Sequence, residues 1–139
     1  MKGKRFTSPE KRFHFIYPED WETLVVEDIP AFFHPEMGGV LQIYSFANKV
    51  GNVDSMTELK NYISVHEIEF NEELVATFTN SEGTNILSCE FKKEDRHWCV
   101  YAISNQNKLL IATFNSDIDI DDKTYKILAS IISSVQFLK

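Results

Sequence analysis

Hydrophobic and polar residues alternate with a period of two in the first strongly patterned segment of this chain, residues 13–17. Every second position there carries an aromatic ring, which predicts a strand with one buried face: Phe13, Phe15 and Tyr17. Pro18 ends this strand, because proline has no N–H to donate to a ladder. Trp21 follows the proline turn, and we expect its indole to pack back against the core.

Further segments have the composition of strands: residues 22–27, 30–34, 40–46, 74–79, 85–92, 96–104 and 108–115. In residues 40–46 the alternation places Leu41 and Ile43 on one side of the strand and Tyr44 on the other. The last three segments follow one another with short polar connections, so they predict an antiparallel meander.

The first hairpin of this meander determines which residues face each other. If Glu94 and Asp95 form a two-residue loop, one face gathers three opposed pairs: Phe91 with Trp98, Cys89 with Val100, and Leu87 with Ala102. Cys89 and Cys99 then point to opposite faces. A three-residue loop centred on Glu94 would place the two cysteines opposite each other, but we favour the register that buries the aromatic pair. The second hairpin is closed by Asn105, Gln106 and Asn107.

Two segments show the period of a helix. Ser55 and Glu58 match a capping box, and the apolar stripe behind them predicts a helix over residues 56–70: Leu59, Ile63, His66 and Phe70. A second stripe predicts a helix near the C-terminus: Tyr125, Leu128, Ile131, Ile132 and Val135. Asp119 or Asp121 caps the second helix, and the chain then ends in a short strand or a docking tail.

These elements predict one α+β domain that spans residues 1–139. We expect an α/β/α sandwich, in which a twisted, mainly antiparallel sheet of about six to eight strands carries helices on its faces. The N-terminal basic cluster is interpreted as a solvated arm that leads into the first strand, with a local contact patch as the alternative: Lys2, Lys4, Arg5, Lys11 and Arg12.

The acidic balance of the chain restricts its partners. The sequence has 14 Lys and Arg against 21 Asp and Glu, a formal net charge of −7. An acidic surface repels phosphate backbones and anionic lipids, so we expect binding to neither nucleic acid nor membrane surfaces. No stretch approaches the roughly 18 apolar residues of a membrane helix. No signal peptide is evident, and two cysteines fit reduced thiols, so the expected location is cytoplasmic.

The histidines are the first candidates for chemistry. His34 and Glu36 lie close together beside a Gly-Gly turn, but two donors fall short of the three or four that zinc takes. His66 lies on an apolar stripe and is interpreted as a partly buried core residue with one backbone partner. His14 and His97 have no nearby Ser, Cys or Asp in the sequence that suggests a catalytic triad.

The remaining motifs favour structure over chemistry. Asp117, Asp119 and Asp121 resemble the start of a calcium loop, but Asp122 stands where that loop needs Gly and Leu128 where it needs Glu. Neither cysteine has a group placed to lower its pKa, and no phosphate loop, dinucleotide fingerprint or nucleophile elbow is present. We therefore predict no catalytic, cofactor-binding or metal-binding residues, no cofactor, and a protein that is not an enzyme.

The order of elements carries a resemblance. Residues 17–21 read Tyr-Pro-Glu-Asp-Trp after the aromatic strand, and residues 133–137 read Ser-Ser-Val-Gln-Phe after the last helix. This layout resembles the PsbP-like α/β/α sandwich superfamily, the fold shared by the photosystem II protein PsbP, the yeast nuclear import factor that binds the Ran GTPase, and many bacterial domains. Asp20 stands where proline turns of the family often carry Gly. The resemblance implies this fold in a bacterial protein, and its matched residues are core residues without a catalytic role.

As function we predict a non-catalytic protein-binding or accessory role. The partner presents a basic patch, and the association weakens with salt. The alternative is a small-molecule-binding protein or an enzyme of unrecognised type, with its site at an open aromatic part of the sheet around Tyr44 or Tyr101. A third interpretation is a homodimer that buries an exposed edge or face of the sheet.

Overall fold

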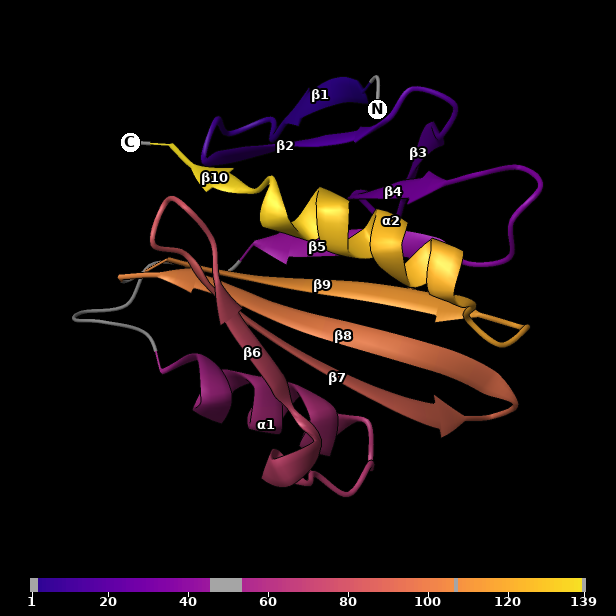
Figure 1. Cartoon of the computed structure of the whole chain (residues 1–139), viewed down its shortest axis with the longest axis vertical. Coiled ribbons are helices and arrows are strands. Elements are labelled where there is room, and N and C mark those ends of the chain that lie inside the picture. The colour runs from indigo at the N-terminus through magenta and orange to yellow at the C-terminus, as the bar shows by residue number, and fades with distance from the viewer. Residues whose placement is uncertain (1–2, 46–53, 107, 139) are drawn as a thin grey trace.

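A seven-stranded antiparallel sheet forms the centre of the structure, a computed structural model that describes residues 3–45, 54–106 and 108–138 (Figure 1). Its spatial order is β3 (Glu22–Val26), β4 (Ile29–Phe33), β5 (Val40–Ser45), β9 (Lys108–Ser116), β8 (Arg96–Asn105), β7 (Asn85–Lys93) and β6 (Ala76–Thr79). A separate antiparallel sheet consists of β1 (Gly3–Thr7), β2 (Phe13–Pro18) and β10 (Gln136–Phe137). The described residues also form the helices α1 (Ser55–Val65) and α2 (Asp122–Ser133) and the 3-10 turn η1 (Glu72–Leu74).

The large sheet separates two hydrophobic cores. Helix α1 lies on one face, where Leu59 and Ile63 pack against residues of β7, β8 and β9. Helix α2 covers the opposite face, with the small sheet beside it (Figure 1). The predicted α+β class and α/β/α sandwich are confirmed, and the main sheet falls within the expected range of strands. The aromatic strand β2, however, belongs to the small sheet and not to the main one.

The rings of the small sheet pack against the large one. Phe15 of β2 is fully buried, and its ring centroid lies 5.1 Å from that of Phe32 in β4 and 5.3 Å from that of Phe6 in β1. Trp21 is 3% exposed and belongs to the same core, as predicted. The backbone N–H of Trp21 donates to the C=O of Pro18 at 3.0 Å, and this hydrogen bond closes the turn. Aromatic pairs contribute about 0.5–1.5 kcal/mol beyond their buried area, so this cluster joins the two sheets firmly.

The first hairpin of the meander has the predicted register. The opposed pairs are Phe91 with Trp98, Cys89 with Val100, and Leu87 with Ala102. Glu94 and Asp95 form the two-residue turn with φ of 54° and 61°, the signs that a type I′ turn requires. Both cysteines are free and lie in opposite cores. In the second hairpin Asn105 pairs with Lys108, so Asn105 is a strand residue, and Asn107 lies outside the described residues.

The N-terminal segment corrects one expectation. Residues 3–7 are not a solvated arm but form β1, which pairs with β2 from Gly3 opposite Pro18 to Thr7 opposite His14. Phe6 is the one apolar residue of this strand, so the sequence contains no alternation that predicts it. The basic side chains of β1 are exposed while its backbone is paired. Lys2 and Phe46 lie outside the described residues.

Both helices begin at an aspartate. Asp54, and not Ser55, caps α1, and its carboxylate accepts a hydrogen bond from the N–H of Thr57 at 3.3 Å. Asp121 caps α2 by accepting from the N–H of Thr124 at 2.8 Å, which confirms one of the two predicted caps. Tyr125 of the predicted stripe of α2 is half-buried, and the other four residues are buried: Leu128, Ile131, Ile132 and Val135. The tail behind the helix forms β10, which pairs with β2.

Helix α1 ends at Val65, five residues earlier than the sequence predicts. Glu67 takes a left-handed φ of 61°, and the N–H of Ile68 donates to the C=O of Ile63 at 3.4 Å, a Schellman motif. Glycine is the usual residue at the position of Glu67, so the chain stops the helix without the residue that normally marks the stop. Phe70 still packs on the α1 core, although it lies beyond the helix.

Candidate functional site

Strand β3 presents an exposed aliphatic edge. All five residues of β3 are exposed, and three are large and apolar: Leu24 at 44%, Val25 at 67% and Val26 at 43%. β3 is the last strand in the order of the large sheet, so one side of its backbone has no neighbouring strand within the described ranges. Unpaired N–H and C=O groups along such an edge are a template for pairing with another chain. The sequence predicted this strand but not its place at the edge.

Acidic residues bracket β3 at both ends. Residues 19–28 contain five carboxylates and no Lys or Arg, and all five are exposed: Glu19, Asp20, Glu22, Glu27 and Asp28. Glu27 and Asp28 form the two-residue turn to β4 with φ of 52° and 67°. The edge therefore combines an apolar centre with negatively charged ends.

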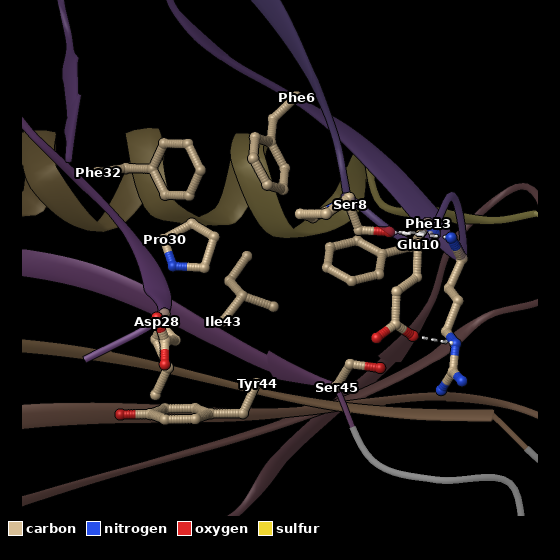
Figure 2. A pocket seen from close by; sticks show the side chains of 13 residues that line it. Phe6, Ser8, Glu10, Phe13, Asp28, Pro30, Phe32, Ile43, Tyr44 and Ser45 are labelled. Atoms are coloured by element: carbon tan, nitrogen blue, oxygen red, sulfur yellow. Dashed lines mark hydrogen bonds and ion pairs between the residues drawn. The ribbon is translucent and has the colours of Figure 1, made fainter. Parts of the chain in front are cut away.

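A cavity of about 390 Å³ opens beside this turn (Figure 2). Its walls combine apolar side chains from both sheets with polar groups at the rim: Phe6, Phe13, Phe32, Ile43, Tyr44, Glu10, Arg12 and Asp28. Tyr44, one of the two positions predicted for a small-molecule site, lines this cavity. Tyr101, the other position, is 5% exposed within the core beneath α2, so the expectation of an open site there is wrong.

His34 is held by two protein partners. Its Nδ1 accepts a hydrogen bond from the N–H of Glu36 at 3.0 Å, and its Nε2 lies 3.2 Å from Oδ2 of Asp20. The contact with Glu36 therefore uses the backbone and not the carboxylate that a metal site requires. Within residues 3–45, 54–106 and 108–138, no group of three or more His, Cys, Asp or Glu side chains is arranged to hold a metal ion.

His97 joins β8 to the start of α2. Its Nδ1 accepts from the N–H of Ile120 at 3.3 Å, and its Nε2 lies 3.3 Å from the hydroxyl of Tyr125. Burial and a hydrogen bond with Glu90 raise the pKa of Tyr125 above its ordinary value. The sequence missed these partners because they lie 23 and 28 residues further along the chain, just before α2 and within it. Asp119 belongs to the segment that resembles the start of a calcium loop in the sequence. Its Oδ1 lies 3.0 Å from Nζ of Lys92, so it forms an ion pair.

The other two histidines lie in packed surroundings. His66 is half-buried at the end of α1, with its ring centroid 4.7 Å from Tyr62 and 6.4 Å from Trp98. Its C=O accepts a hydrogen bond from Nζ of Lys93. His14 is half-buried on β2, and its Nδ1 has no hydrogen-bond partner among the described residues.

Both thiols are protonated at neutral pH. Burial raises the pKa of Cys89 to about 11 and the pKa of Cys99 to about 12. The thiolate is the reactive form of cysteine, so this shift suppresses nucleophilic reactivity. Neither described helix combines the length and apolar character that crossing a membrane requires.

Comparison with known proteins identifies the fold. No protein-family model matches the chain, and no curated protein matches it. A crystal structure of a protein from Bacteroides thetaiotaomicron superposes with a TM-score of 0.72 and 20% identity, over 100% of this chain and 50% of the other, so this chain spans half the length of that protein. The solution structure of cyanobacterial PsbP (CyanoP) from Synechocystis sp. PCC 6803 superposes with a TM-score of 0.64 and 14% identity, over 98% of this chain and 92% of the other. The two likenesses together show that this chain has a PsbP-like fold.

Proposed function

We propose that this chain is a non-catalytic accessory domain of bacterial type, which binds another protein through the exposed edge of β3. In this proposal residues 1–139 act as one domain, without catalytic, cofactor-binding or metal-binding residues. The two similar structures described above come from bacteria, which supports the bacterial assignment. The two buried free thiols support a reducing location such as the cytoplasm.

The exposed edge of β3 carries this proposal. Val26 and Ile29 close a two-residue turn and form the hydrogen-bonded pair nearest to it, so hydrogen-bonded pairs recur at every second residue. Thr23 and Val25 occupy the alternate, non-hydrogen-bonded positions of β3. Their N–H and C=O groups therefore point away from β4. An added strand gains main-chain hydrogen bonds from these groups, as in recognition by β-augmentation.

The charge around β3 specifies the partner. An extended segment that alternates apolar and polar residues would match Leu24 and Val26, which share one face of β3, and Lys or Arg at its ends would meet the acidic residues that bracket the strand. Such an association is strongest at low salt, because the charged ends are solvent-exposed. A nucleic acid would meet the same carboxylates with like charge and is disfavoured.

A homodimer in which β3 pairs with β3 of a second copy is less favourable than binding of a basic partner. Antiparallel self-pairing would bring the acidic turn Glu27–Asp28 of one copy toward the acidic start of the other strand, near Glu22. Like charges placed together oppose association, so we expect a monomer at micromolar concentration. A sedimentation mass of one chain across a concentration series is the expected result.

A peptide titration tests the docking edge. The probe is a synthetic peptide with a Thr-Val alternating centre and lysines at both ends, and its matched control carries glutamates in place of the lysines. We expect the basic peptide alone to shift the amide NMR signals of β3 and to slow hydrogen exchange at Thr23 and Val25. Val25→Lys should abolish binding, because an edge lysine opposes strand addition.

Val65→Lys is the matched control, since Val65 is 78% exposed on α1, away from the sheet edge. This variant should bind the basic peptide as wild type does. Equal binding of the acidic peptide, or equal loss of binding in both variants, would contradict docking at β3.

A further inference from the structure

The cavity beside the β3–β4 turn arises where β4 and β5 separate. The pairing of β4 with β5 ends with Ala31 opposite Gln42. The residue before Ala31 is Pro30, which has no N–H to continue the ladder toward the β3–β4 turn. β5 nevertheless stays paired with β9 as far as Ser45. The two strands therefore diverge beyond Pro30, and the gap is a feature of the backbone and not of one side-chain rotamer.

The small sheet covers this gap. Figure 2 shows the ring of Phe6 above Pro30 and Ile43 and the ring of Phe13 beside them, so side chains of β1 and β2 face the large sheet here. The resulting space of about 390 Å³ lies within the range of small-ligand sites, roughly 300–1,000 Å³. Its apolar and aromatic walls suit a ligand with an aryl or alkyl body.

The charges at the rim differ in their availability. Arg12 pairs with Glu10, with Nε and Oε2 2.8 Å apart, so the carboxylate of Glu10 balances the positive charge of Arg12. Asp28 lies across the cavity from Glu10 in Figure 2. Its carboxylate has no ion pair or side-chain hydrogen bond with any described residue. The rim therefore carries one net negative charge, and the carboxylate of Asp28 is its free group.

We propose that this cavity binds a small organic cation, an amine carried on an aryl or alkyl body, with the body between Phe6 and Ile43 and the ammonium group at Asp28. The ring of Tyr44 adds a face that attracts cations. An anionic ligand is disfavoured, because the rim carries a net negative charge and the carboxylate of Glu10 balances the one cationic side chain of the lining, Arg12. This site does not require strand docking at β3, although Asp28 takes part in both proposals.

Three probes of similar shape and different charge test this site in the intact chain: phenethylamine, phenethyl alcohol and phenylacetate. Each is titrated at neutral pH while the amide NMR signals are followed. Phenethylamine should shift signals of residues that line the cavity, phenethyl alcohol should bind about three- to fivefold more weakly, and phenylacetate more weakly still. Equal affinity for the amine and the alcohol, or shifts away from the cavity, would overturn the proposal.

Two variants locate the charge and the space. Asp28→Asn should weaken phenethylamine binding about three- to fivefold and leave the alcohol unchanged. Asp95→Asn is the matched control, because Asp95 occupies the same position of a two-residue Glu-Asp turn with φ of 61° in the β7–β8 hairpin. Ser45→Trp fills the cavity from β5 and should remove binding of both probes. Wild-type amine affinity in Asp28→Asn or in Ser45→Trp would rule out this site.

Discussion

Ser134 accepts a hydrogen bond from the backbone N–H of Ile16 at 2.8 Å, across 118 residues of sequence. The same hydroxyl lies 2.6 Å from the C=O of Ile131, to which it donates at the end of α2. β10 pairs with β2 only at residues 13 and 14. Beyond this short ladder, the hydroxyl of Ser134 accepts the hydrogen bond from the N–H of Ile16. The Ser-Ser-Val ending of the last helix therefore connects the two sheets through α2.

Removal of this hydroxyl should destabilise the fold. Ser134→Ala leaves the N–H of Ile16 without its partner at a part-buried position, and we expect the free energy of unfolding to fall by about 1–3 kcal/mol. Ser133→Ala is the control, because the Ser133 hydroxyl is exposed and bonds only within α2, so its effect should stay within about 0.5 kcal/mol. Urea unfolding measures both values, and equal values would show that the link to β2 contributes nothing.

Two turn glycines, Gly39 and Gly83, provide a second pair of variants. A Cβ at Gly39 would overlap Cζ of the buried Phe114 and lie 2.7 Å from its Cε2, whereas a Cβ at Gly83 meets nothing within 4 Å. Both glycines have positive φ, 99° and 77°. Gly83→Ala should therefore cost about 1 kcal/mol from backbone strain alone.

Gly39→Ala adds a clash with a core ring to the same strain. We expect a loss of about 2 kcal/mol or more in the free energy of unfolding, measured by urea titration beside Gly83→Ala. A loss no larger than that of Gly83→Ala would mean that Phe114 moves aside without cost.

Much of the fold was predictable because it depends on local patterns. The register of the β7–β8 hairpin followed from the pairing of Phe91 with Trp98, and the buried face of α2 followed from its stripe. β1 was missed because a strand with one apolar residue shows no alternation. The end of α1 was missed because Glu67 stands where glycine normally marks a stop.

The candidate sites were less predictable, for a different reason. Alternation identifies a strand but not its neighbours, so nothing in the sequence of β3 shows that Val25 lies at an open edge. The cavity requires Pro30 to end one ladder and Phe6 to cover the gap from another sheet. Both features are set by tertiary arrangement. Tyr44 and Tyr101 were both predicted as lining residues because each is an aromatic residue on a strand of the sheet. Tyr44 lines the cavity, whereas Tyr101 is buried in the core.

Glu67 offers a stabilising substitution. Glu67→Gly places the residue without a Cβ at a φ of 61°, and relief of the left-handed strain should raise the free energy of unfolding by about 0.5–1 kcal/mol. Glu69→Gly is the control: Glu69 is exposed and has a negative φ, so glycine there should slightly destabilise the protein. Thermal unfolding of the two variants should move in opposite directions, and a fall in stability for Glu67→Gly would refute the assigned helix stop.

The buried thiols should make the protein sensitive to alkali. Burial raises the pKa of Cys99 from its ordinary value of 9.0 to about 12, so the folded state disfavours the thiolate. The unfolded state loses this proton first as the pH rises through 9, and stability therefore decreases above that pH. Cys99→Ala should show a weaker decrease between pH 9 and 11 in urea unfolding.

Iodoacetamide at pH 8 should modify neither cysteine until urea unfolds the chain, and rapid labelling of the native protein would contradict their burial.

The cap of α2 should make stability depend on acid in the opposite sense. Hydrogen bonds from the side chain and the N–H of Thr124 hold the pKa of Asp121 below its ordinary value of 3.8. A lowered folded pKa means that the cap contributes fully above the unfolded value, and that the contribution is lost as the pH falls below about 3.8. Asp121→Asn keeps a good capping residue without the charge, so its stability should match wild type at pH 7 and fall less steeply below pH 4. Asp122→Asn, which leaves the cap bond in place, should retain the acid dependence of wild type. Parallel acid profiles for wild type and Asp121→Asn would show that the ionised cap does not contribute.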